Sequence, residues 1–218
     1  MILGYHLMFS AYGFWLPNDP RGSGSDEVRS EKLLEFGGPT KVAAHDFRAR
    51  QPHDRRKRLA AKAAMDYPPV AFTGVQARAI ARGFTNSVRR SKVTIWACAV
   101  MPDHVHLVVA PHRHTIEVLA GLLKGEATRQ LVKEGIHPFQ DRKGYRTQVP
   151  PCFGRKWWVI FKDNEEALLN AIRYAERNPL KAGLPSQQWT CVVQYPGLYQ
   201  PAEQEVQGEE RVEVEEGE

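Results

Sequence analysis

Four short runs of apolar, β-branched and aromatic residues predict four β-strands. They read YHLMFSAYG, VTIWACAVMP, HVHLVVAP and KWWVIFK, and begin at residues 5, 93, 104 and 156. Turn-forming residues separate them, including a tight Met-Pro-Asp turn between the second and third runs. We therefore expect a sheet whose second and third strands form a hairpin.

Three longer segments repeat their apolar residues at helical spacing. They read TGVQARAIARGFTNSVRRSK, TIEVLAGLLKGEATRQLVKEG and DNEEALLNAIRYAERNP, and the last is expected to end at Pro179. The resulting element order predicts an α+β fold, a ferredoxin-like split βαβ. We expect four or five antiparallel strands, helices on one face and an added C-terminal helix.

The chain is expected to form one domain over residues 1–200. Between about 22 and 72 the regular spacing of apolar residues is replaced by charged residues, Gly and Pro. This composition predicts an inserted basic segment with one short helix. Residues 201–218 contain eight Glu and one Arg, a net charge of −7, and are expected to form a disordered tail.

Residues 1–200 carry 29 Lys and Arg against 17 Asp and Glu, a net charge of +12. A basic body of this kind commonly binds polyanions, and the acidic tail is a candidate competitor for the same surface. The three cysteines show no C-x-x-C spacing and are expected to be buried small hydrophobes. No run of 18 apolar residues occurs, so we expect a cytoplasmic protein without membrane contact.

Two histidines one residue apart interrupt the third predicted strand, at His104 and His106. Side chains alternate across a strand, so both share a face with Val108, while Val105 and Leu107 share the other. One face suits a core and the other presents two imidazoles. Hydrogen-bonded or surface histidines explain this pattern as readily as metal ligands do, because H-x-H alone is weakly specific.

A longer combination is more specific. The stretches WACAVMPDHVHLVVAPH and AIRYAERNPLKAGL together resemble the REP-associated tyrosine transposases, which belong to the HUH single-tyrosine transposases of the insertion-sequence type. The opening YHLMFSAYGFWLPNDPRG and the helix LLKGEATRQL are also similar to that family. The resemblance covers most of residues 5–185, apart from the inserted segment.

The resemblance implies an enzyme that cuts and rejoins single-stranded DNA through a 5′-phosphotyrosine. It implies that His104 and His106 hold a divalent metal, Mg²⁺ or Mn²⁺, with Asn178 as third ligand and Tyr174 as nucleophile. Tyr174 and Asn178 lie at i and i+4, so they share one face of a helix. Imidazole and amide ligands are softer than those Mg²⁺ prefers, so Mn²⁺ should bind at least as well.

Basic and aromatic residues near these motifs are candidates for DNA contact. The predicted set is Lys124, Arg129, Arg155, Lys156, Trp157 and Lys181. Trp157 and Trp158 alternate on a strand, so one should be core and the other free to stack on a base. The sequence does not distinguish them.

Other functions remain open at this point. A DNA-hairpin-binding protein that acts mainly by occupancy would share the basic body, and a ferredoxin-like RNA-binding module would share the fold. The motifs favour the enzyme, because a binding protein need not retain all four site residues. The expected partner is single-stranded or hairpin DNA, and the chain is expected to act as a monomer or homodimer.

Overall fold

The computed structural model describes residues 1–14, 16, 19, 31–38, 54–142 and 148–198. Within them a four-stranded sheet has the order β2-β3-β1-β4, and all neighbouring strands are antiparallel. The strands are β1 (Gly4–Ser10), β2 (Ile95–Val100), β3 (His104–Val109) and β4 (Trp158–Lys162). The first strand in the chain thus lies inside the sheet, between β3 and β4.

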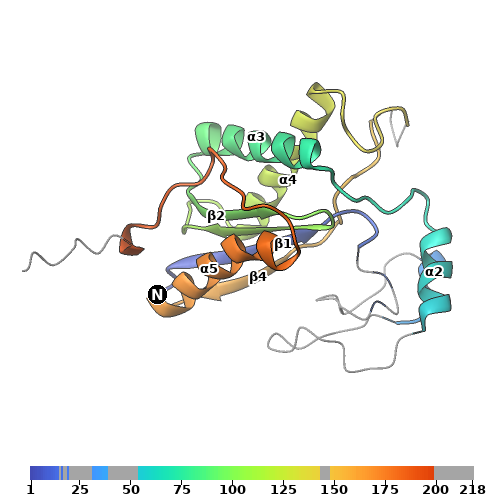
Figure 1. Ribbon diagram of the computed structural model, residues 1–218, viewed down its shortest axis with the longest axis horizontal. Helices are drawn as coiled ribbons and strands as arrows, with labels where there is room; N and C mark the ends of the chain where they lie inside the picture. The colour runs from blue at the N-terminus through green and yellow to red at the C-terminus, as the bar shows by residue number, and fades with distance from the viewer. Residues whose placement is uncertain (15, 17–18, 20–30, 39–53, 143–147, 199–218) are drawn as a thin grey trace, which may run out of the picture.

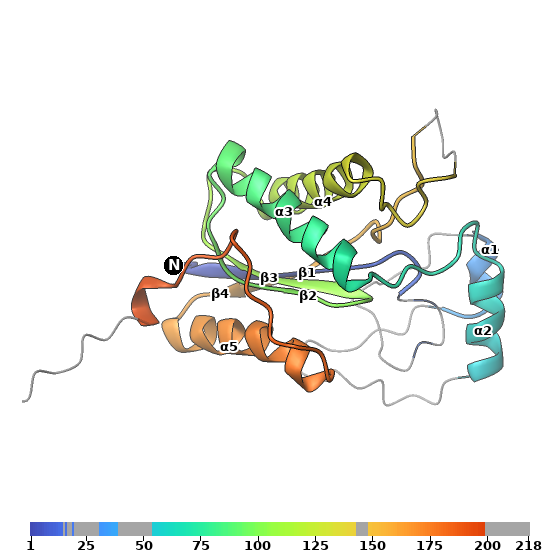
Figure 2. The ribbon, with the colours of Figure 1, turned by 45° about the horizontal axis from the view of Figure 1, so that its top comes forward.

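Helices cover both faces of the sheet, as Figure 2 shows. On one face lie α3 (Gly74–Ser91) and α4 (Ile116–Lys133), which connect β1 to β2 and β3 to β4. On the other face lies the added helix α5 (Glu165–Lys181). This arrangement confirms the predicted α+β, ferredoxin-like split βαβ fold with four antiparallel strands.

The alternation of side chains in the strands divides the core into two clusters. The larger cluster lies under α3 and α4 and includes Phe9, Val105 and Leu107. The smaller cluster lies under α5 and joins Val108 of β3 to apolar residues of the helix such as Ile172. The two faces predicted for β3 are therefore confirmed, and the histidine face is the one beneath α5.

The two helices on the large cluster approach each other closely at Gly83. A Cβ atom at this position would lie 2.6 Å from the Cα atom of Ala127 and 2.7 Å from the carbonyl oxygen of Glu126. Both contacts involve the backbone of α4, which cannot rotate away. Only glycine allows this approach.

The inserted segment contains the expected basic helix, α2 (Arg55–Ala63), and a second, one-turn helix, α1 (Glu31–Leu34). The Asp54 side chain caps α2 by accepting hydrogen bonds from two backbone N–H groups. Helix α2 lies beyond one end of the sheet (Figure 1), and α1 lies at the same end (Figure 2). Much of the insertion, and the acidic tail, lie outside the described residues, and no helix of the described part is long and apolar enough to cross a membrane.

The predicted end of α5 at Pro179 is wrong, because the helix continues to Lys181. Proline lacks an N–H donor and its ring crowds the carbonyl four residues earlier, but here it stands in the last turn, where few hydrogen bonds follow. Ala182 then ends the helix by donating its N–H to the carbonyls of Asn178 and Pro179. Tyr174 and Asn178 therefore lie in one uninterrupted helix.

Candidate active site

Two strands and one helix bring their polar side chains together on the α5 face of the sheet. In the antiparallel register, His106 of β3 lies opposite Met8 of β1, and His104 lies opposite Ser10. The rings of His104 and His106 are perpendicular, with centroids 4.7 Å apart. The two imidazoles predicted on this face thus form one cluster.

A third histidine, His6, belongs to the same cluster, and the sequence motifs did not reveal it. Its Nε2 shares a 3.0 Å hydrogen bond with Nδ1 of His106, and both side chains are buried. His6 comes from β1, one hundred residues earlier in the chain. Its place follows from the β1–β3 register, which puts His6 and Met8 on the same face as His106.

Each of the two histidines predicted to bind metal, His104 and His106, uses one of its two ring nitrogens in a hydrogen bond. Nδ1 of His104 lies 2.7 Å from Oδ1 of Asp103, while Nδ1 of His106 faces His6. Phe14 stacks on the His104 ring at 5.4 Å. In both histidines Nε2 has no hydrogen-bond partner among the described residues, so both rings are held with this atom available.

Tyr174 lies on α5 directly against this cluster. Its ring centroid is 5.3 Å from that of His106 and 5.8 Å from that of His6. The side chain is half-buried, and burial raises the pKa of the phenol, while the Asn178 side chain acts in the opposite direction. Lys181 places its ammonium nitrogen 5.4 Å from the ring centroid of Tyr174. The tyrosine of this chain therefore meets the histidines of the same chain.

Asn178 lies one turn beyond Tyr174, and its Nδ2 is buried with no hydrogen-bond partner in the part of the chain that the structure describes. An NH2 group cannot ligate a metal, so the fit requires the amide to be flipped, with Oδ1 at this unpartnered position. Two imidazoles and an amide oxygen form a plausible ligand set for a divalent metal. No group of three His, Cys, Asp or Glu in the described part of the chain is arranged to hold one, so the fit depends on Asn178.

Two histidines of the site, His6 and His106, are uncharged at neutral pH. Burial lowers the pKa of His106 well below its ordinary value, and the neighbouring His104 and His6 act in the same direction. Burial, with a contribution from Lys162, lowers the pKa of His6 to about 4. Neutral imidazole is the form that binds metals.

A second H-x-H pair in the sequence, His112 and His114, has a structural role in a turn. The ring of His112 interacts with the carbonyl of Ser91 at 2.8 Å through Nε2, and its Nδ1 accepts the backbone N–H of His114 at 3.0 Å. Both ring nitrogens of His112 are therefore used locally, away from the cluster on β3.

The residues predicted to contact DNA do not form one surface. Lys181 lies at Tyr174, whereas Lys124 lies on α4, across the sheet. The ammonium of Lys124 donates to the carbonyls of Gly154 and Arg155 and lies 5.3 Å from the Trp157 ring centroid. Burial lowers the pKa of Lys124 to about 8. Lys124 therefore holds the loop before β4 in place with its donors.

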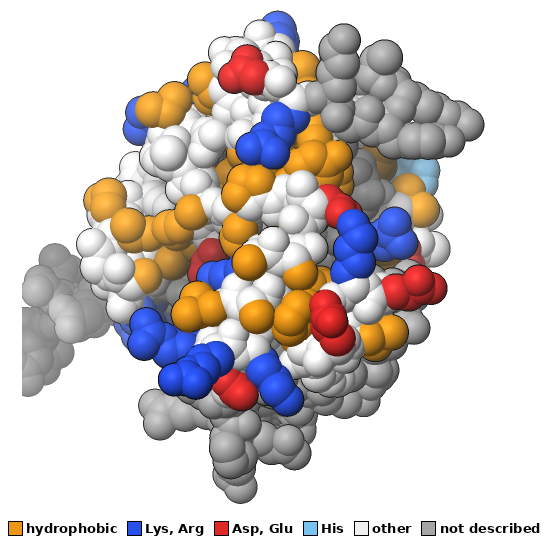
Figure 3. Space-filling view, turned by 90° about the vertical axis from the view of Figure 1, so that its right-hand side faces the viewer, with side chains coloured by type: hydrophobic (Ala, Val, Ile, Leu, Met, Phe, Trp, Pro, Cys, Tyr) orange, Lys and Arg blue, Asp and Glu red, His pale blue; other side chains and the backbone are white. Residues whose placement is uncertain are grey.

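The structure distinguishes the two tryptophans at the start of β4, Trp157 just before the strand and Trp158 as its first residue. Trp157 packs against the large core cluster, whereas Trp158 pairs with Met8 and shares the face of His106. Trp158 is therefore the better candidate for stacking on a base. The remaining predicted residues, Arg129, Arg155 and Lys156, are exposed. On the side shown in Figure 3, basic side chains occur in small groups separated by apolar and neutral ones.

Comparisons with known proteins agree with the motifs. Residues 67–147 match the family model described as "Transposase IS200 like", a range that includes both histidines of β3 and ends before Tyr174. Among solved structures, a REP-associated tyrosine transposase bound to a REP hairpin is 12% identical, with a TM-score of 0.43, over 84% of this chain and 70% of that one.

A candidate transposase from Deinococcus radiodurans R1 is 14% identical, with a TM-score of 0.37, over 81% of this chain and 91% of that one. The comparison with curated proteins found no match. The resemblance read from the motifs is thus confirmed where the family model applies: over residues 67–147, this chain is similar to the IS200-like transposases.

Proposed function

We propose that this protein is a metal-dependent transposase that cuts and rejoins single-stranded DNA through a 5′-phosphotyrosine. The observation that carries the proposal is the contact of Tyr174 with His106 within one chain, at a ring distance of 5.3 Å. The family match supports a transposase, and the geometry supports Tyr174 as its nucleophile.

In the proposed reaction the Tyr174 oxygen attacks a backbone phosphorus. The bond from phosphorus to Tyr174 forms, the bond to the 3′ oxygen breaks, and the phenolic proton is lost as the 3′-hydroxyl gains one. Rejoining reverses these steps with another 3′-hydroxyl and needs no ATP, because the phosphotyrosine retains the energy of the broken ester. Lys181 supplies positive charge beside the nucleophile.

His104, His106 and Asn178 are the proposed metal ligands. The metal would supply charge stabilisation at the scissile phosphate. His6 orients His106: when His106 Nδ1 donates its proton to His6 Nε2, the Nε2 of His106 is left with a lone pair. Asp103 performs the same task for His104.

We propose hairpin DNA as the substrate class. The support is the basic body of the chain and the solved relative, which was studied with a REP hairpin. The direct test is to incubate the protein with labelled single-stranded DNA that contains a hairpin and to detect a covalent adduct after denaturation. A protein acting by occupancy alone would bind the hairpin and give no adduct.

Removing the metal or one ligand should abolish the adduct. We expect EDTA and His106→Ala each to reduce adduct formation at least 100-fold, because both remove the charge stabilisation of the phosphate. His114→Ala is the matched control, since it removes an imidazole from the turn after β3 and should leave adduct formation unchanged. Undiminished cleavage in EDTA would refute the metal assignment.

Substituting His6 should weaken metal binding without abolishing the reaction. We expect His6→Ala to lower Mn²⁺ affinity about 10–100-fold, as for other partners of metal-bound histidines. A titration followed by calorimetry measures this directly, and saturating Mn²⁺ should restore most of the adduct. If saturating Mn²⁺ restores nothing, His6 does more than orient His106.

A further inference from the structure

We propose that the groove between α3 and α4 is a second DNA-binding site, which holds the sugar-phosphate backbone of duplex DNA. This inference rests on the proposed function, since it assigns a place to the stem of the hairpin substrate. The groove has a volume of about 1110 Å³ and lies across the sheet from Tyr174.

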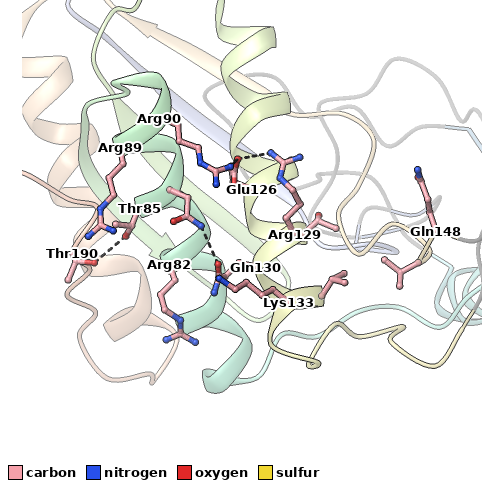
Figure 4. Close-up of a pocket in the computed structure, with 14 residues that line it drawn as sticks. Arg82, Thr85, Arg89, Arg90, Glu126, Arg129, Gln130, Lys133, Gln148 and Thr190 are labelled. Carbon is pink, nitrogen blue, oxygen red and sulfur yellow. Dashed lines mark hydrogen bonds and ion pairs between the residues drawn. The ribbon is translucent and has the colours of Figure 1, made fainter.

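Five of the fourteen residues that line this groove are cationic (Figure 4). Three come from α3 and two from α4, and all are exposed. They are Arg82, Arg89, Arg90, Arg129 and Lys133. Successive turns of two adjacent helices thus present positive charge to the same space, as a surface for a line of phosphates requires.

The carboxylates near the groove neutralise only part of this charge. Glu126 is the only acidic residue among the described residues that line it, and it lies 3.2 Å from Arg90 and 2.8 Å from Arg129. Glu134, at the end of α4, pairs with Arg82. Within the described residues, Arg89 and Lys133 make no ion pair. These two cations are therefore the ones available to an external phosphate.

The remaining lining favours backbone contact over base stacking. It consists of neutral polar residues and two valines, and the described lining contains no aromatic residue. Sites for unpaired bases use aromatic side chains as stacking platforms, whereas a duplex keeps its bases stacked internally and presents phosphates. Thr85 and Thr190, whose hydroxyls lie 3.2 Å apart at one side of the groove, add donors of the kind that phosphate oxygens accept.

The groove lies on a different face of the sheet from the residues proposed to carry out the reaction. It lies on the helical face that α3 and α4 form, whereas the Tyr174 site lies beneath α5 on the opposite face of the sheet (Figure 2). DNA held in the groove would therefore not contact the reacting atoms. Such contacts stabilise the bound substrate and the transition state equally, so they lower KM and leave kcat unchanged.

The test uses the double variant Arg89→Ala/Lys133→Ala, because neither side chain makes an ion pair with another described residue. The matched control is Arg55→Ala/Lys57→Ala, which removes the same charge from exposed positions on α2. Binding is measured in the full chain carrying Tyr174→Phe, with a hairpin and with an unpaired strand of equal length, between 50 and 200 mM salt.

We expect the groove variant to bind the hairpin about 10-fold more weakly at 0.1 M salt, with a salt slope smaller by about 2. Its affinity for the unpaired strand and the affinities of the control should change less than about 2-fold. In the chain with Tyr174 intact, kcat for adduct formation at saturating hairpin should not change. Equal losses for hairpin and unpaired strand, an equal loss in the control, or no loss would each overturn the proposal.

These outcomes are independent of the proposed chemistry. A protein that binds hairpins through the groove but forms no adduct would contradict the phosphotyrosine reaction and leave the groove assignment standing. If the protein forms the adduct while the groove variant binds the hairpin normally, the phosphotyrosine reaction stands and the groove assignment is contradicted.

Discussion

Tyr174→Phe should eliminate the covalent DNA adduct while leaving DNA binding within a few-fold of the wild-type value. The substitution removes only the hydroxyl, so the ring keeps its place 5.3 Å from His106 and beneath Lys181. Without that oxygen no bond to phosphorus can form. Denaturing gel electrophoresis of labelled DNA measures the adduct, and a filter or mobility assay measures binding.

Tyr195→Phe is the matched control for this experiment. Tyr195 packs edge-on against Trp96, and its hydroxyl lies 3.4 Å from the Glu165 carboxylate, near the start of α5. It should form the adduct at the wild-type rate. Persistence of the adduct in Tyr174→Phe would show that another tyrosine is the nucleophile and that the contact of α5 with the histidines has a different purpose.

Gly83→Ala should destabilise the protein by roughly 2–4 kcal/mol, more than a typical surface substitution. The new methyl group would lie 2.6 Å from the Cα atom of Ala127, so α3 and α4 would have to separate. Separation would also disturb the contacts of both helices with the large core cluster. Denaturant unfolding followed by circular dichroism measures the loss.

Gly121→Ala provides a control of opposite sign. Gly121 is also in a helix, α4, and a Cβ atom there would meet no atom within 4 Å. Alanine is the better helix former, so this variant should gain about 0.5–1 kcal/mol. Equal effects of the two substitutions would contradict the close approach of the helices at Gly83.

Local patterns in the sequence predicted the helices and strands of the fold, and they predicted which neighbouring residues of the site share a face. Alternation in β3 placed His104 and His106 on one face, and helical spacing placed Tyr174 beside Asn178. Both inferences use distances of a few residues, over which backbone geometry is fixed. The order of elements then restricted the topology to a few alternatives, of which the ferredoxin-like one is observed.

The rest depended on contacts between distant segments. His6 joins the cluster through the register of β1 against β3, which the sequence does not specify locally. The choice between Trp157 and Trp158 followed from the register of β4 on β1. Lys124 has the positive charge expected of a DNA contact. Its hydrogen bonds, however, go to the two carbonyls that the loop before β4 brings to it.

The central position of β1 also has a consequence for the order in which the protein forms during synthesis. This strand pairs with β3, about one hundred residues later, and with β4, later still. At about 5–20 residues per second, the ribosome needs roughly 5–20 s before the first partner of β1 exists. The histidines can therefore assemble before α5 has been translated, but the tyrosine arrives last. A nascent chain that stops before Glu165 would contain both histidines of β3 but not Tyr174, so the proposed cutting reaction would be restricted to chains whose sheet is already complete.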